Sequence, residues 1–254
     1  MNPIPVPAKF RIIAHRGASA YAPENTLPAF ALARNMGVIE IETDAQLAID
    51  GEVVLCHDNT LARYGHGDRL VESISSQELL ALDMGAWYSP YLFADTPMMT
   101  LDQLLNEFKG ELVYHIELKG AAPGLAAAVD ARVTRCRLSS NVIYTSFSFI
   151  QLERMRAVAT DAKLGWLVDD FDDELLARAR DLGIFQLCPR ADRITDELVA
   201  KGKEFVPEVR AWGMRGGAME LRALIAEVAR CGCDGMTINW PDWAQREQEN
   251  LSLK

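Results

Sequence analysis

Residues 38–57 read VIEIETDAQLAIDGEVVLCH, and this stretch decides how the rest of the chain is interpreted. It holds two apolar runs typical of strands, Val38–Asp44 and Val53–His57, separated by only eight residues. A crossover between parallel strands needs about a dozen residues or more, so these two strands cannot be parallel neighbours. The dipeptide Asp50-Gly51 favours a tight turn instead, which predicts a hairpin over Gln46–Leu55.

The predicted hairpin has a register with a chemical consequence. If its turn holds two residues, Ile49 pairs with Glu52, and counting back along both arms brings Asp44 opposite His57. Directly opposed residues in an antiparallel pair lie about 4.5–5.5 Å apart. We therefore expect the hairpin to return a histidine to a position beside a carboxylate.

Outside the hairpin, strand and helix patterns alternate. The other candidate strands are Phe10–Ala14, Leu112–Glu117, Asn141–Thr145, Lys163–Leu167, Ile184–Cys188, Phe205–Arg210 and Gly235–Ile238. Helical patterns lie at Thr26–Met36, Ala126–Arg137, Phe147–Ala159, Asp172–Leu182, Thr195–Lys203 and Met219–Cys231. Without the second hairpin arm, eight parallel strands remain, which predicts an α/β fold of the (β/α)8 TIM-barrel type.

Residues 1–254 are expected to form one such domain, because barrels of this length are common. Residues 58–99 break the alternation and contain one short helical patch, Ser75–Leu82. They predict a small inserted subdomain at the barrel mouth.

Composition excludes several classes of partner. The chain is 49% apolar and 24% charged, with a formal net charge of −10. An acidic chain without a Lys/Arg block argues against nucleic-acid binding and against stable association with anionic membranes, but not against a small phosphate ester. Neither a signal peptide nor a transmembrane stretch is evident, and the five cysteines are scattered, so we expect a cytoplasmic protein. The oligomeric state is left open.

Charged and polar side chains follow several predicted strands at the edge where such barrels carry their active sites. Glu42 and Asp44 lie two apart on one strand and so share a face, and Glu117 ends the next barrel strand. Three carboxylates sharing a site favour a hard cation such as Mg²⁺ or Ca²⁺. The alternative is a rim of salt bridges in which Arg16 or Lys119 supplies the counter-charge.

Two histidines, His15 and His57, lie at the same predicted rim and suit acid/base work near neutral pH. Either one can instead be a hydrogen-bonded structural residue. Arg16 and Lys119 are candidate phosphate contacts, with rim ion pairs as the alternative. His115 is a third, weaker candidate.

The segment Pro23-Glu24-Asn25-Thr26 precedes a helical pattern. Asn25 or Thr26 can simply cap that helix, or Glu24 or Asn25 can orient His15 or the substrate. Trp212 can wall a binding pocket or belong to the core.

Taken together, these motifs resemble the glycerophosphodiester phosphodiesterase family over residues 10–243. The matching pieces are His15-Arg16-Gly17, Pro23-Glu24-Asn25-Thr26, Glu42-x-Asp44, Asp50-Gly51 with His57-Asp58, Glu117-Leu118-Lys119, Leu82-Asp83-Met84-Gly85 with Trp87, Thr145-Ser146-Phe147 and Asn239-x-Pro241-Asp242. Departures from the family pattern occur at Ile39, at Met99 and at Gly213-Met214 after Trp212.

The resemblance implies a TIM barrel that hydrolyses small-molecule glycerophosphodiesters, such as glycerophosphocholine or glycerophosphoethanolamine, to an alcohol and sn-glycerol 3-phosphate. It implies Mg²⁺ or Ca²⁺ on Glu42, Asp44 and Glu117, with His15 and His57 as the acid/base pair. It implies phosphate contacts from Arg16 and Lys119, to which we add Glu24, Asn25 and Trp212 as candidate substrate contacts.

Two other functions compete with this one. A lysophospholipase D-like enzyme would use the same barrel on lysolipids and needs an apolar platform, which Leu79-Leu80 or the segment Trp87–Phe93 can supply. A non-catalytic barrel that binds a phosphoester is the weaker alternative, because every histidine and carboxylate that the chemistry needs is present.

Overall fold

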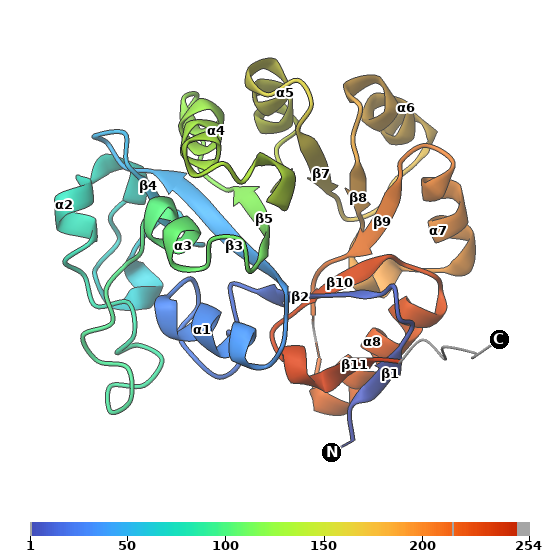
Figure 1. Ribbon diagram of the computed structural model, residues 1–254, viewed down its shortest axis with the longest axis horizontal. Helices are drawn as coiled ribbons and strands as arrows, with labels where there is room; N and C mark the ends of the chain where they lie inside the picture. Colours follow the sequence, from blue (N-terminus) through green and yellow to red (C-terminus); the bar gives the residue numbers. More distant parts are fainter. Residues whose placement is uncertain (1, 215, 248–254) are drawn as a thin grey trace.

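A closed barrel of eight parallel strands forms the centre of the protein. The computed structural model describes residues 2–214 and 216–247 (Figure 1). The strands, in the order in which they pair around the barrel, are β2 (Arg11–His15), β3 (Glu40–Leu47), β5 (Val113–Leu118), β6 (Val142–Ser146), β7 (Lys163–Leu167), β8 (Gln186–Cys188), β9 (Glu208–Ala211) and β10 (Gly235–Ile238). Because β10 pairs with β2 and β2 with β3, these eight strands close into a barrel, and the predicted (β/α)8 fold is confirmed.

Helices surround this barrel as crossover connections. They are α1 (Leu27–Asn35), α3 (Leu101–Glu107), α4 (Leu125–Cys136), α5 (Phe149–Val158), α6 (Asp173–Leu182), α7 (Asp196–Lys203) and α8 (Ala218–Arg230) (Figure 1). In α4 the buried residues Leu125, Val129, Val133 and Cys136 recur every three or four positions and so form one inward stripe. Six of these helices match predicted patterns.

The seventh outer helix, α3, was not predicted. It has only seven residues, too few for a clear periodic pattern, but Thr100 and Gln103 form a capping box at its start. A second element missed from sequence is the parallel pair of β1 (Ile4–Val6) and β11 (Ala244–Arg246). Each of these strands has three residues, so neither shows an alternation that could be recognised.

The hairpin is present, but its predicted register is wrong by one residue. β3 pairs antiparallel with β4 (Val53–Leu55), and Asp44 lies opposite Cys56, whose N–H donates to its carbonyl at 3.0 Å. The reason is the turn, which holds three residues closed by Gly51 at φ +84°. His57 therefore lies one position beyond the residue that faces Asp44.

The inserted segment packs on the outer side of this hairpin. Its elements are η1 (Ala62–Tyr64), η2 (Val71–Ser73) and α2 (Ser76–Leu79), a shorter helix than the predicted Ser75–Leu82. A separate hydrophobic cluster joins the hairpin residues Ala48, Val54 and Cys56 to seven residues of the segment, Leu61, Tyr64, Val71, Ile74, Leu79, Met84 and Met98. We propose on this basis that residues 58–99 are a subdomain inserted into the single barrel domain.

The five cysteines are free thiols and all are buried. Among the described residues, no helix combines the length and the apolar character needed to cross a membrane.

Gly17 shows how tightly the first active-site turn packs. It has φ +82°, and a Cβ placed on it would lie 2.6 Å from the carbonyl carbon of Ala29 in α1. Gly37, at the end of α1, has the same φ of +82° but no atom within 4 Å of such a Cβ.

This contrast gives a matched pair of variants. Gly37→Ala should lower the free energy of unfolding by roughly 1–2 kcal/mol, the cost of a left-handed backbone at a non-glycine residue. Gly17→Ala should cost about 1–3 kcal/mol more, because α1 must also move. Urea unfolding of both variants measures the difference, and equal losses would contradict the close packing of this turn on α1.

Candidate active site

One cavity of about 240 Å³ opens at the carboxyl ends of the barrel strands. Seven of the residues predicted for the site line it: His15, Arg16, Glu42, His57, Glu117, Lys119 and Trp212. Eight further lining residues were not among the predicted site residues: Thr145, Phe147, Leu167, Arg210, Gly213, Met214, Thr237 and Asn239. The barrel thus brings residues from both ends of the chain to one rim.

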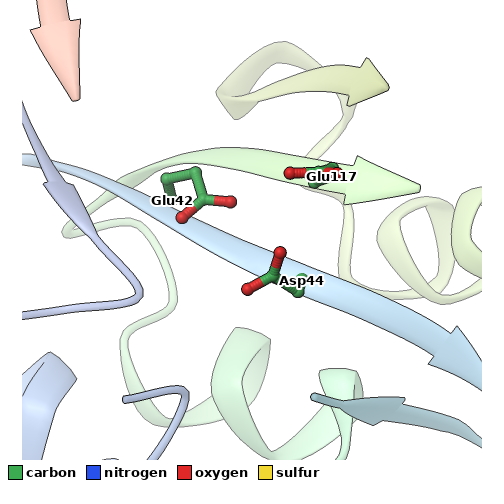
Figure 2. Close-up of side chains that lie close together, drawn as sticks. All are labelled: Glu42, Asp44 and Glu117. Carbon is green, nitrogen blue, oxygen red and sulfur yellow. The ribbon is translucent and has the colours of Figure 1, made fainter. Parts of the chain in front are cut away.

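Three buried carboxylates lie close together, as Figure 2 shows. Two of them, Glu42 and Glu117, line the cavity, whereas Asp44 does not. Glu42 and Asp44 share a face of β3, and the β3–β5 register places Glu117 next to Asp44. One oxygen from each lies within 4.8 Å of the others. We call these three residues the carboxylate cluster.

The cluster resists full ionisation. Burial, and then the charge of Asp44, raise the pKa of Glu117 to about 7, while Lys119 opposes the shift. Burial, Asp44 and Glu117 likewise hold the pKa of Glu42 well above its usual range. Burial is the largest effect on Asp44 and raises its pKa, but Arg16, His57, Lys119 and the Asn25 hydrogen bond together outweigh it and keep that pKa below normal.

The cluster fits a hard divalent cation such as Mg²⁺ or Ca²⁺. Its donors are all carboxylate oxygens, the ligands that these ions prefer. In addition, Asp44 Oδ1 is buried and has no hydrogen-bond partner among the described residues, which is costly for an anionic oxygen unless something else binds it.

Arg16 ties the first turn to the cluster. Its backbone is left-handed, with φ +54°, and its N–H donates to Glu42 Oε2 at 3.0 Å. Its Nε lies 3.1 Å from Asp44 Oδ2, close enough for an ion pair although not aligned for a hydrogen bond. Nη1 donates to Glu24 at 2.9 Å. The salt-bridged rim considered from sequence therefore exists around Arg16, within the same site.

Asn25 holds Asp44 in place. Its Nδ2 donates to Asp44 Oδ2 at 2.8 Å, and its Oδ1 accepts from the Thr43 hydroxyl at 2.8 Å and from the Asp44 N–H at 3.3 Å. Neither Asn25 nor Glu24 lines the cavity, and neither hydrogen-bonds to His15. Thr26 occupies the N-cap position of α1, but its hydroxyl donates to the Pro23 carbonyl instead of capping the helix.

Each histidine of the predicted pair has one ring nitrogen engaged. His15 Nδ1 donates to Asn239 Oδ1 at 2.6 Å, and His57 Nδ1 donates to Asp58 Oδ1 at 2.6 Å. Because Nδ1 carries the proton in both rings, Nε2 is the acceptor in their neutral forms. Burial, followed by the charge of Arg16, lowers the pKa of His15 to about 3. Burial also lowers the pKa of His57, against the opposing charge of Asp44.

Arg63 of the inserted segment links the two halves of the site. It donates to Asp58, which holds His57, and to Glu24, which holds Arg16. Burial disfavours a charged Asp58, but the hydrogen bonds and charges of Arg63 and His57 together outweigh it and lower the pKa of Asp58 to about 2. Sequence reasoning missed Arg63 because no local pattern marks it; only the folded insertion brings it between the two carboxylates.

The walls of the cavity combine a cation with aromatic rings. Lys119 Nζ donates to Glu117 at 3.2 Å and lies 5.6 Å from the centre of the Phe147 ring. Phe147 and Trp212 meet edge to face at 4.6 Å, and Trp212 Nε1 donates to the Val168 carbonyl at 2.8 Å. Trp212 therefore forms part of the wall, as one of the two sequence interpretations expected.

The floor of the cavity is polar. Arg210 is almost fully buried and donates to Gln186 at 2.9 Å and to Thr237. Its Nη2 and the hydroxyl of Thr145 are both buried, and neither has a hydrogen-bond partner within residues 2–214 and 216–247. His115 lies deeper, outside the cavity, and pairs with Glu40 at 3.0 Å.

Comparisons with known proteins agree with this geometry. A family model described as the glycerophosphoryl diester phosphodiesterase family matches residues 15–243. The chain is 31% identical over 252 residues to YhdW of Bacillus subtilis, provisionally named a glycerophosphodiester phosphodiesterase, with 95% of this chain and 99% of the relative covered. It is 28% identical over 239 residues to a glycerophosphodiester phosphodiesterase of Caldanaerobacter subterraneus, covering 92% and 96%.

A solved structure shares the fold as well. It is that of an Oleispira antarctica phosphodiesterase in complex with the product sn-glycerol-3-phosphate. The TM-score is 0.80 at 25% sequence identity, and the match covers 93% of this chain and 94% of that chain.

Asn25 offers a test of the cluster. Asn25→Gly keeps a residue that tolerates φ +56° but removes the amide that holds Asp44. Because such supporting hydrogen bonds orient metal ligands, the affinity for Mg²⁺ or Ca²⁺ should fall about 10- to 100-fold. Calorimetric titration of the cation measures this, and an unchanged affinity would contradict the role given to Asn25.

Proposed function

The chain belongs to the glycerophosphoryl diester phosphodiesterase family, and from that premise we propose that it hydrolyses glycerophosphodiesters to an alcohol and sn-glycerol 3-phosphate. The membership confirms the resemblance that the sequence motifs predicted. The observation that carries the proposed chemistry is the carboxylate cluster flanked by two histidines, Arg16 and Lys119 at one cavity.

A divalent cation is part of the proposal. Glu42, Asp44 and Glu117 would hold Mg²⁺ or Ca²⁺, and the bound ion would polarise a phosphoryl oxygen as a Lewis acid. Arg16 and Lys119 border the cavity from two sides and would neutralise the remaining charge of the phosphate. Glu24 and Asn25 would act through Arg16 and Asp44, since their side chains bind those residues.

The two histidines have different roles in proton transfer. A carboxylate stabilises an imidazolium more than an amide does, and only His57 has a carboxylate, Asp58, on its Nδ1. We assign His57 as the acid that protonates the leaving alkoxide. His15, whose partner is the neutral Asn239, is the base that takes a proton from the attacking hydroxyl.

One observation favours a second candidate, a lysophospholipase D-like activity. Tyr91 and Leu92 of the inserted segment are 95% and 77% exposed and could meet a lipid surface. The other residues considered for such a platform pack inward, because Leu79 is fully buried and Trp87 contacts Tyr64 and Tyr88 edge to face. Cleavage of lysophosphatidylcholine in preference to glycerophosphocholine would support this candidate.

Histidine variants test the assignment of acid and base. His15→Ala and His57→Ala should each lower kcat/KM for glycerophosphocholine about 10²- to 10⁴-fold while the fold is retained. With bis(p-nitrophenyl) phosphate, whose leaving group needs no proton, the loss in His57→Ala should be much smaller than in His15→Ala. Full activity in either variant contradicts the acid/base pair, and equal losses on both substrates contradict the division of labour.

Removal of the cation should abolish activity. Exhaustive EDTA treatment should stop hydrolysis of glycerophosphocholine, and added Mg²⁺ or Ca²⁺ should restore it, because three buried carboxylates cannot orient a phosphate anion by themselves. Product release before and after dialysis is the measurement. Activity that survives complete chelation would rule out the cation requirement.

A further inference from the structure

A second, larger hollow adjoins the active-site cavity. It has a volume of about 510 Å³, and the inserted segment contributes Asn59 and Glu72 to its lining. The segment after β5 contributes Lys119 and Gly120, and the segment after β6 contributes Ser148 and, from α5, Arg154. Lys119 lines both hollows. We call the second one the Glu72 groove.

A phosphodiester has two arms, and the first cavity suits one of them. Its floor presents two buried polar groups without partners, Arg210 Nη2 and the Thr145 hydroxyl, which suit a hydroxylated arm such as glycerol. A phosphate beside Lys119 would then direct its other arm toward the Glu72 groove.

On the basis of the proposed function, we propose that the Glu72 groove binds the leaving-group arm and that Glu72 selects arms bearing an ammonium group. This would make the inserted segment a determinant of substrate choice. Glu72 is the one carboxylate among the described residues of the lining, and Leu70 and Ile150 add apolar side chains that are 56% and 58% exposed, a pairing that matches an alkylated ammonium. Of the two cations that also line the groove, Lys119 is paired with Glu117, which leaves Arg154 as the charge that opposes Glu72.

Glu72 is held firmly in this position. Its Oε1 accepts the Ala122 N–H at 3.0 Å. A Cβ on Gly120 would lie 2.3 Å from the same oxygen, so the residue after Lys119 must be glycine for the carboxylate to lie against this loop. The hydrogen bond places Glu72 against the loop that follows Lys119, and no hydrogen bond to its second oxygen occurs among the described residues.

Two charge-neutralising variants should move selectivity in opposite directions. Glu72→Gln keeps an oxygen that can accept the Ala122 N–H and removes only the charge. Arg154→Gln removes a positive charge from the opposite wall. The readout is the ratio of kcat/KM for glycerophosphocholine to that for glycerophosphoglycerol, whose leaving arm is neutral.

In Glu72→Gln the ratio of kcat/KM for glycerophosphocholine to that for glycerophosphoglycerol should fall about fivefold, which corresponds to roughly 1 kcal/mol for a partly exposed ion pair. In Arg154→Gln the same ratio should rise. Glu174→Gln, an exposed residue of α6, is the control and should leave the ratio unchanged. The affinity for sn-glycerol 3-phosphate, which lacks the leaving arm, should be the same in Glu72→Gln and the wild type.

Two results would overturn the inference. The first is an unchanged ratio of kcat/KM values in Glu72→Gln. The second is a loss of affinity for sn-glycerol 3-phosphate in Glu72→Gln as large as its loss of kcat/KM for glycerophosphocholine, which would make Glu72 a structural residue. Failure of the proposed function would look different, because the wild type would then hydrolyse neither diester. If the wild type hydrolyses neither diester, the groove can still be tested by calorimetric titration with glycerophosphocholine. Glu72→Gln should weaken this binding, and unchanged binding would overturn the inference.

Discussion

Three carboxylates buried within 4.8 Å of one another are the constraint around which this site is arranged. Like charges at such distances in a poorly hydrated place repel strongly, so each must be compensated. Each carboxylate has a compensating contact. The Arg16 guanidinium lies beside Asp44, and its backbone N–H donates to Glu42. Lys119 donates to Glu117, and Asn25 donates to Asp44. Among the described residues, Asp44 Oδ1 is the one fully buried oxygen of the cluster without a hydrogen-bond partner, and this is where the arrangement still lacks a positive charge.

The inserted segment is integral to this arrangement. A continuous chain of polar contacts runs from His57 through Asp58, Arg63 and Glu24 to Arg16, and so to the carboxylate cluster. Arg63 and Asp58 come from the insertion, whereas His57 follows the hairpin arm and Glu24 lies in the loop between β2 and α1. The hydrophobic cluster beneath the insertion fixes Arg63, because Leu61 and Tyr64 on either side of it are buried there. Stability of the insertion and order at the active site are therefore coupled.

The barrel and most of its rim could be predicted from sequence for a simple reason. Parallel strands end at the same edge, so polar residues that follow them converge whatever the details of the helices between. Features that depend on three-dimensional packing could not be predicted. The three-residue turn shifted the hairpin register, so His57 reaches the cavity beyond the strand pair and not opposite Asp44. Arg63 and the polar floor at Arg210 carry no local signal, since their partners are distant in the chain.

The central claim, that the carboxylate cluster holds a divalent cation, is tested most directly by diffraction from crystals grown with Ca²⁺ and examined for anomalous scattering. The account predicts one strong peak about 2.3–2.6 Å from oxygens of Glu42, Asp44 and Glu117. A cluster without such a peak, with its charges balanced only by Arg16 and Lys119, would contradict it.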